Sequence, residues 1–484
     1  MTQADPTNAP SAGKTKAEPG GGYSLGVKII AVLAVLSAGV LAFFPDPDRG
    51  ELELLTFSKG HADTYRPMLN DPAFRARTRL PTVEVIQTNT QPLSRRISAS
   101  FWSGTEVGDV IEVERGMIGA FFSTTLKAIG FVDLTDRLES EGLLESINTP
   151  SFAPWTTRGR IFGLPHDVHP VMLAYHKGIF DGAGVDVESI ETWTDFRREM
   201  QKVVAAKGDD GRPLRYGIAM WTANFNDQIE ALMLQAGGGT FILDPETGRE
   251  VLAVNHEANA VVLANVVAWC VGPNRIAIDA PEFNPSANQL KLEGRVAAAI
   301  MPDWLAGVWQ KDLPGLSGEI RLMPLPAWSV DPQRRRTTVW GGTAMMIPRT
   351  AKDHEVSWRL AKELYLSREL AEELYKVNRI ISPMTSMWGE DFYHQPDPYF
   401  GGQQPGTLFI ELAPDVPLRT SSPFRGTALG KIGQAIFDLK QYADDEGVHE
   451  PDALLPEARR LLQKAHDLTR EEMDRNLILG SESW

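Results

Sequence analysis

Two tryptophans lie beside residues that could recognise a small molecule. Trp340 is followed by Gly341 and Gly342 inside an apolar stretch, and Trp304 directly follows Asp303 at the end of another. An aromatic ring can stack on the apolar face of a ligand, and a carboxylate accepts hydrogen bonds from it. The glycine pair would let a ligand or another segment approach the backbone. A simple bulge or tight bend explains the glycines equally well.

The elements that position such residues follow an alternating pattern. Strands are predicted at residues 51–58, 81–88 and 109–113. Predicted helices separate them, which favours a parallel sheet. Ligands of open α/β sheets bind beyond the carboxyl ends of the strands. Lys59, His61 and Glu114 follow the first and third strands and are therefore candidates, although Lys59 and His61 could simply form a solvated turn.

Residues 160–170 are rich in residues that break regular structure. Two prolines in this stretch interrupt both helices and strand ladders, which suits a segment that passes between two domains. His166 and Asp167 lie between these prolines, and either a buried hydrogen bond or a ligand contact would explain them. His166 and His169 are not expected to share a helical face there, so no metal site is predicted.

Two further residues are candidates for the ligand site, and three tryptophans are expected to pack in cores. Trp221 ends a predicted strand, and Arg425 follows a Pro- and Gly-rich loop region at 383–423; both are candidates for the ligand site. A helix is predicted over residues 353–374, with apolar residues at helical spacing. Three other tryptophans lie within helical patterns and are expected to pack in cores: Trp193, Trp269 and Trp358.

Composition limits the function classes. A chain of 484 residues suggests two or three globular units. A net charge of −15 excludes a basic face for a nucleic-acid partner. One cysteine cannot form a disulfide within the chain. The sequence has no Gly-x-Ser-x-Gly elbow, P-loop or His-Glu-x-x-His motif, so no enzymatic activity and no cofactor are predicted.

The first residues differ from the rest of the chain. Residues 1–24 are rich in Pro, Gly, Ala, Ser and Thr and are predicted to be disordered. Residues 25–45 are apolar over about 20 positions, close to the length that spans a bilayer. Lysines precede this run and aspartates follow it, which predicts a cytoplasmic N-terminus. A retained anchor is favoured, and a signal segment cleaved after Ala42 is the alternative.

Several blocks of the chain resemble one family. Their order matches that of the sugar-binding solute-binding proteins of ABC importers related to maltose-binding protein. Departures from the usual pattern are Gly108, His176 and Pro302. The blocks are Asp109–Gly116, Gly163-Leu164-Pro165, Tyr175-His176-Lys177, Thr192–Phe196, Gly294–Gly307 and Trp340-Gly341-Gly342 ahead of Ile347-Pro348.

The resemblance implies an α/β fold of the type II periplasmic-binding-protein kind, with two lobes and a hinge, preceded by one hydrophobic helix. One lobe would comprise residues 51–165 and 330–373, and the other residues 170–325 and 374–475. The chain would cross between them at residues 165–170 and near Trp340. A ligand between the lobes would favour the closed form, which a membrane permease would then recognise.

The expected ligand is a saccharide, because sugars combine apolar faces with hydroxyl-rich edges. The expected partners are the permease subunits of an ABC importer, and the chain is expected to be monomeric and outside the cytoplasm. A membrane-anchored sensor or scaffold of the same fold is the alternative, followed by a glycan-active enzyme. The candidate site residues are Trp304, Trp340, Asp303, Gly341, Gly342, Trp221, Glu114, Asp167, His166, Lys59, His61 and Arg425.

Overall fold

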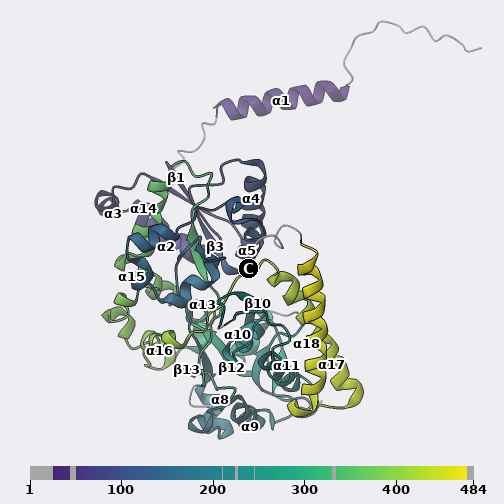
Figure 1. Cartoon of the computed structure of the whole chain (residues 1–484). Coiled ribbons are helices and arrows are strands. Elements are labelled where there is room, and N and C mark those ends of the chain that lie inside the picture. Colours follow the sequence, from purple (N-terminus) through teal and green to yellow (C-terminus); the bar gives the residue numbers. More distant parts are fainter. Residues whose placement is uncertain are drawn as a thin grey trace, which may run out of the picture. The chain divides into compact units, whose positions relative to one another are not determined.

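A computed structural model describes residues 25–43, 51–209, 211–223, 227–244, 246–329 and 334–476 (Figure 1). The chain forms two compact units, residues 1–49 and residues 50–484. In the first unit, helix α1 (Leu25–Phe43) is the described element. Across the described ranges, no helix combines the length and apolarity needed to cross a membrane. The predicted tail, 1–24, and the last two positions of the predicted 25–45 segment lie outside these ranges.

The first sheet of the second unit has the strand order β2-β1-β3-β14-β6. Its strands are β1 (Leu52–Thr56), β2 (Val83–Gln87), β3 (Val110–Glu114), β6 (Leu164–Pro165) and β14 (Thr343–Met346). The first three are parallel, and β14 runs antiparallel to both β3 and β6. The carboxyl ends of β1 and β3 therefore meet at one edge, next to the start of β14.

The second sheet has the order β11-β8-β12-β7-β13. Its strands are β7 (Val171–His176), β8 (Tyr216–Met220), β11 (Ala277–Asp279), β12 (Val296–Pro302) and β13 (Ile320–Pro324). The central strand β12 is buried at every position, which explains its continuous apolar run. Two short hairpins complete the strands: β4 (Thr156–Thr157) with β5 (Arg160–Ile161), and β9 (Phe241–Leu243) with β10 (Glu250–Leu252).

Helices cover both sheets (Figure 1). Those in the core of the first sheet are α2 (Lys59–Asn70), α3 (Pro72–Thr78), α4 (Thr90–Ser103), α5 (Arg115–Phe121), α6 (Thr135–Ser140), α7 (Leu143–Ser146), α14 (His354–Tyr365) and α15 (Arg368–Asn378). Those around the second are α8 (Lys177–Ala183), α9 (Trp193–Val204), α10 (Asp227–Gln235), α11 (Glu257–Cys270), α12 (Pro285–Leu292), α13 (Asp303–Asp312), α16 (Pro405–Leu412), α17 (Arg425–Glu446) and α18 (Pro451–Asp474). The 3-10 turns are Leu126–Ala128, Thr149–Trp155, Val187–Ser189, Pro314–Leu316, Thr385–Met387, Asp391–His394, Pro398–Phe400 and Ala413–Asp415.

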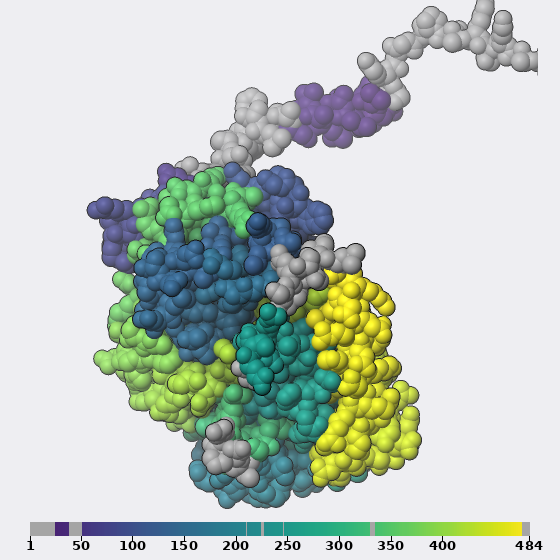
Figure 2. Space-filling view, in the orientation of Figure 1, coloured from purple at the N-terminus to yellow at the C-terminus, as the bar shows by residue number. Residues whose placement is uncertain are grey.

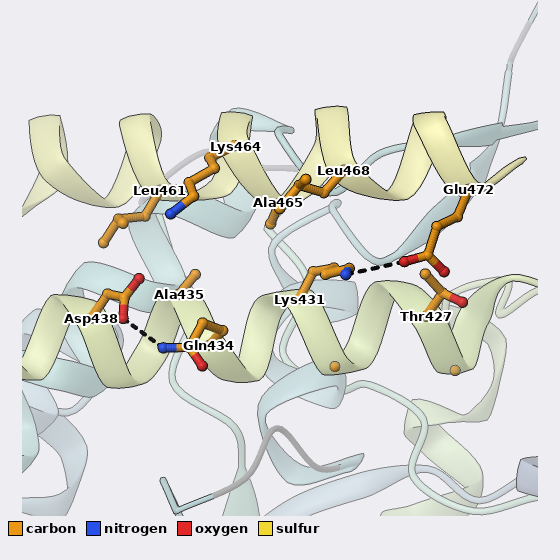
Figure 3. A pocket seen from close by; sticks show the side chains of 12 residues that line it. Thr427, Lys431, Gln434, Ala435, Asp438, Leu461, Lys464, Ala465, Leu468 and Glu472 are labelled. Carbon is orange, nitrogen blue, oxygen red and sulfur yellow. Dashed lines mark hydrogen bonds and ion pairs between the residues drawn. The ribbon is translucent and has the colours of Figure 1, made fainter. Parts of the chain in front are cut away.

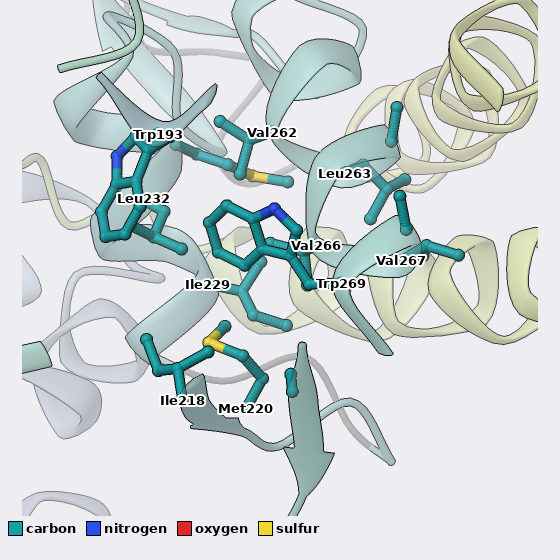
Figure 4. Packing of buried hydrophobic residues seen from close by; sticks show 14 of the residues in the cluster. Trp193, Ile218, Met220, Ile229, Leu232, Val262, Leu263, Val266, Val267 and Trp269 are labelled. Carbon is teal, nitrogen blue, oxygen red and sulfur yellow. The ribbon is translucent and has the colours of Figure 1, made fainter. Parts of the chain in front are cut away.

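The core of the second sheet is built around two tryptophans (Figure 4). The rings of Trp193 and Trp269 lie 5.2 Å apart between β8, α10 and α11. Helix α11 is apolar almost all round, because α10 packs on it from one side and α17 and α18 from another. Trp193, Trp269 and Trp358 are all buried, which confirms that these three tryptophans serve packing.

The two C-terminal helices, α17 and α18, lie side by side and are exposed on one face, in yellow (Figure 2). A groove of about 430 Å³ runs between them (Figure 3). Lys431 of α17 reaches Glu472 of α18 across it, with Nζ and Oε1 3.0 Å apart. None of the candidate site residues lines this groove.

Three local predictions were wrong. Lys59 to His61 do not form a turn but open α2, because the Ser58 hydroxyl accepts a hydrogen bond from the His61 N–H and caps the helix. The helix predicted at 353–374 is two helices, α14 and α15, because Ser367 caps the second one. The loop region predicted at 383–423 contains helix α16, which begins with Pro405.

Candidate functional site

The carboxyl ends of β1 and β3 face the second sheet across a hollow of about 360 Å³, here called the aromatic pocket. Residues from both sheets line it, and so does the stretch that leads into β14. A molecule bound there contacts both halves of the unit. The lining residues are Phe57, Ser58, His61, Glu114, His169, Asp227, Phe283, Trp304, Trp340, Gly341, Gly342, Thr343 and Ile380.

Three aromatic rings form a corner of this pocket. Trp304 and Phe283 stack with their centroids 5.7 Å apart and an angle of 19° between their planes. Trp340 stands almost perpendicular to Trp304, at 5.9 Å and 87°. The Trp304 Nε1–H donates to the Trp340 carbonyl over 2.8 Å, which fixes this arrangement. Phe283 is 63% exposed, so its ring is available to a ligand.

The glycine pair permits both a special backbone conformation and a close approach. Gly341 has φ +110° and Gly342 has φ +132°, values that side chains rarely tolerate. A Cβ at Gly341 would lie 2.8 Å from Cδ2 of His169 and 2.9 Å from Nε1 of Trp304. The glycine pair therefore forms a backbone bend that is also part of the pocket wall. A tight bend and a close approach to another segment, the two explanations of the glycines, both hold.

Two carboxylates provide acceptors in the pocket. Glu114 ends β3, and its Oε2 accepts a hydrogen bond from the Gly116 N–H over 2.8 Å. Burial raises the pKa of Glu114, and the nearby charge of Asp227 raises it further. Asp227 opens α10 from the opposite side of the pocket. Carboxylates facing a partly closed pocket suit a ligand that carries several hydrogen-bond donors.

Asp303 lies beneath the pocket wall and does not line the pocket. Its side chain is fully buried. Its Oδ1 is 2.7 Å from His169 Nδ1 and accepts the Trp304 N–H over 2.7 Å, while Oδ2 accepts the Ile381 N–H over 3.0 Å. Asp303 therefore positions the wall by holding His169 and the backbone at Trp304.

A chain of buried polar groups, here called the hinge network, links the two sheets through residues 165–170. Its members are Glu112, Tyr65, His166, Asp167, His169 and Asp303. Tyr65 donates to Glu112 over 2.5 Å and lies 3.1 Å from His166 Nε2. Asp167 Oδ2 lies 3.1 Å from His166 Nδ1 and 2.9 Å from His169 Nε2. The predicted candidates His166 and Asp167 are thus buried in this network.

The hinge network keeps a charge in the protein interior. Burial lowers the pKa of His169, but the carboxylates of Asp167 and Asp303 outweigh burial and raise it to about 10. Burial would raise the pKa of Asp167, but His169 and His166 hold it well below its usual range. His169 is therefore a cation between two carboxylates at neutral pH, with a left-handed φ of +56°.

His61, Glu112 and His166 bring potential metal ligands within 4.8 Å of one another, all buried. However, Glu112 already accepts hydrogen bonds from Thr56, Tyr65 and Tyr365, and its Oε2 lies 3.0 Å from His61 Nδ1. Burial opposes the ionisation of Glu112, but His61, His166 and the Thr56 hydroxyl lower its pKa to about 2. The geometry fits a closed hydrogen-bonded cluster.

Arg425 lies in a second buried cluster, here called the arginine cluster: Arg115, Arg419 and Arg425 around Asp227 and Glu230. Arg425 Nη2 is 2.7 Å from Asp227 Oδ1 and 2.6 Å from Glu230 Oε2. Burial lowers the pKa of Arg425, but both carboxylates raise it above its usual value. Arg425 does not line the aromatic pocket itself but pairs with Asp227, which does.

The structure brings half of the predicted candidates together. Trp304, Trp340, Gly341, Gly342, Glu114 and His61 line the aromatic pocket. Lys59 points to solvent and pairs with Asp63 over 2.5 Å, and Trp221 is half-buried beyond the end of β8. Asp227, Phe283 and Phe57 also line the pocket but were not predicted, since none of them belongs to a recognisable motif.

Known proteins resemble this chain over most of its length. The family of bacterial extracellular solute-binding proteins matches residues 66–369. The arabinooligosaccharide-binding protein of Bacillus subtilis is 25% identical over 401 residues, which is 80% of this chain and 86% of that protein. Its counterpart in Halalkalibacterium halodurans is 23% identical over 368 residues, 75% of this chain and 77% of that protein.

A solved structure shows the same fold. It is an ABC-transporter-associated binding protein of B. animalis subsp. lactis in complex with beta-1,6-galactobiose, with a TM-score of 0.62 and 16% identity. The match covers 87% of this chain and 98% of that one. The two-lobe fold expected from the sequence is confirmed, and a role in binding rather than catalysis agrees with the family. The chain belongs to the family of bacterial extracellular solute-binding proteins.

Proposed function

We propose that this protein is the substrate-binding component of an ABC importer and captures an oligosaccharide in the aromatic pocket. One observation carries the proposal: a single pocket combines the rings of Trp304, Trp340 and Phe283 with the carboxylates of Glu114 and Asp227. Rings suit the apolar faces of sugars, and carboxylates suit their hydroxyl groups. The two relatives named for arabinooligosaccharides favour that class of ligand.

The position of the pocket supports delivery by closure. Residues of both sheets line it, so a bound saccharide contacts more protein when the lobes are closed than when they are open. A ligand with such a difference in affinity shifts the population towards the closed form. Permease subunits in the membrane would then accept the sugar from that form.

We infer the lobe boundaries and the attachment from sequence features. One lobe comprises residues 51–165 and 330–373, and the other residues 170–325 and 374–475. Residues 25–45 tether the protein to the outer face of the inner membrane, which the apolar run and its flanking charges support. The protein acts as a monomer. Pelleting of the full chain with membranes, and its loss from the pellet without residues 1–45, tests the tether.

Calorimetry tests the function. The full chain is titrated with arabinotriose, maltotriose and beta-1,6-galactobiose, and the saccharide is recovered and analysed by chromatography. The expected result is one saccharide bound per chain, with arabinotriose bound most tightly and recovered intact. Cleavage of a saccharide would contradict a binding protein. Absence of heat with all three, from folded protein, would contradict an oligosaccharide ligand.

A further inference from the structure

Arg115 joins the two halves of the structure. It follows β3 of the first sheet and opens α5, yet its side chain is fully buried against α10 of the other half. Its Nη2 lies 2.8 Å from Glu230 Oε2 and 3.3 Å from Asp227 Oδ1. These ion pairs therefore run directly from one half of the structure to the other.

The ion pairs of the arginine cluster join three cations to two anions, and the carboxylate of Glu114 is a further charge close to Arg115. Asp227 and Glu230 are also bound by Arg419 and Arg425, so two carboxylates share three guanidinium groups. Without Arg115, two cations would face two anions. Among the residues that the structure describes, Nε and Nη1 of Arg115 are buried and have no hydrogen-bond partner. A buried donor without an acceptor opposes the contact that buries it.

The surroundings of Arg115 fix its stem and its helix. Its Cβ would lie 3.5 Å from a Cβ at Gly342, and its N–H donates to the Gly342 carbonyl over 3.0 Å. One turn along α5, a Cβ at Gly119 would lie 2.6 Å from the Ser422 carbonyl oxygen. Helix α5 thus packs directly on the segment before α17, and the guanidinium is held against the cluster.

We propose that Arg115 is an interlobe latch: a positioning residue that favours the closed form before a saccharide binds. Its ion pairs with Asp227 and Glu230 draw the lobes together. Separation of the lobes would hydrate its two unpaired N–H groups and leave a balanced cluster of two arginines and two carboxylates. The latch therefore holds weakly and can be released. The proposal rests on the proposed function only in assuming that the lobes open and close.

Distance measurements without saccharide test the latch. Spin labels on the exposed positions Arg95 of α4 and Asp445 of α17, in full chain carrying Cys270→Ala, report the separation of the lobes by double electron–electron resonance. The parent protein should show a closed population beside an open one. Arg115→Met, which keeps the stem and removes the charge, should lose most of the closed population. For the saccharide that binds in calorimetry, its Kd should rise about tenfold, which corresponds to about 1.4 kcal/mol.

Arg425→Met is the matched control, because it removes a cation from the same cluster but leaves Arg115 with both carboxylates, and its ion pairs with Asp227 and Glu230 lie within one lobe. Its closed population should equal or exceed that of the parent. An unchanged distribution in Arg115→Met, or an equal loss in Arg425→Met, would overturn the latch. If circular dichroism shows that Arg115→Met is unfolded, Arg115→Gln replaces it with the same two outcomes. Because no saccharide is present, failure of the latch leaves the proposed function standing.

Discussion

Two buried charge clusters connect the halves of this protein, and they differ in how completely their groups are paired. In the hinge network, both ring nitrogens of His166 and of His169 have partners, and both oxygens of Asp303 do. In the arginine cluster, Nε and Nη1 of Arg115 and Nε of Arg419 have none among the described residues. A cluster whose buried polar groups all have partners is expected to stay intact, whereas a cluster with unpaired buried groups can separate when the lobes open.

The chain topology explains this difference. Residues 165–170, which join the first sheet to the second, supply three members of the hinge network, so it lies where the lobes remain attached. The arginine cluster combines Arg115 with α10, with Arg419 in the segment before α17 and with Arg425, the first residue of α17. None of these adjoins Arg115 in sequence. The comparison predicts that changes in the hinge network affect stability and that changes at the pocket and arginine cluster affect binding.

The largest expected effect is that of His169→Asn. Asn tolerates the left-handed backbone of this position but carries no charge, so Asp167 and Asp303 lose their shared cation. The free energy of unfolding, measured in urea, should fall by about 3–5 kcal/mol. His176→Asn is the control, since His176 lies 3.8 Å from Glu319 and is near the surface. Equal losses of unfolding free energy in the two variants would show that the hinge network contributes no more to stability than a residue near the surface.

The positive charge on His169 should also make the stability of the protein depend on pH. The pKa of His169 is near 6.5 in the unfolded chain and about 10 in the folded one. Its contribution is therefore complete below pH 6.5 and is lost as the pH rises towards 10, by at most about 1.4 kcal/mol per pH unit. Urea titrations from pH 6 to pH 10 should show this decline in the parent and a flatter profile in His169→Asn. Parallel profiles would count against a charged His169.

Gly341→Ala should cost less, about 2 kcal/mol, because the new Cβ meets His169 and Trp304 at a backbone conformation that alanine avoids. The control is Gly430→Ala in α17, where a Cβ meets nothing within 4 Å. That variant should gain about 0.5–1 kcal/mol from helix propensity. Thermal unfolding of both variants measures the difference. Unchanged stability of Gly341→Ala would show that the pocket wall adjusts to the added side chain.

Trp304→Ala should have the smallest effect on stability but a clear one on binding. Loss of the ring should weaken saccharide binding by more than about 1 kcal/mol in calorimetry, because large aromatic rings often dominate the binding energy of an interface. Trp340→Ala should weaken it similarly, with added loss of stability because that ring is almost buried. Trp102→Ala, on a ring that is 91% exposed, is the control. Normal binding by both pocket variants would place the site elsewhere.

Much of the fold could be predicted from the sequence, because alternating strands and helices are local patterns. Trp304, Trp340 and the glycines could be predicted too, since rings and glycines at strand ends are unusual. The hinge network could not, because its contacts join distant positions: Glu112 meets His61 at a separation of 51 residues and Tyr365 at a separation of 253. Asp227 and Arg115 likewise lie 112 residues apart. Such pairs depend on tertiary packing, which no local pattern records.

A saccharide bound in the aromatic pocket should close the lobes. The most direct measurement is the distance between labels at Arg95 and Asp445 in the presence of a saturating concentration of the saccharide that calorimetry identifies. We expect a single short distance in the parent protein, and an unchanged mixture of distances for Trp304→Ala at the same concentration. An unchanged distribution in the parent, while calorimetry shows that the saccharide is bound, would contradict this expectation.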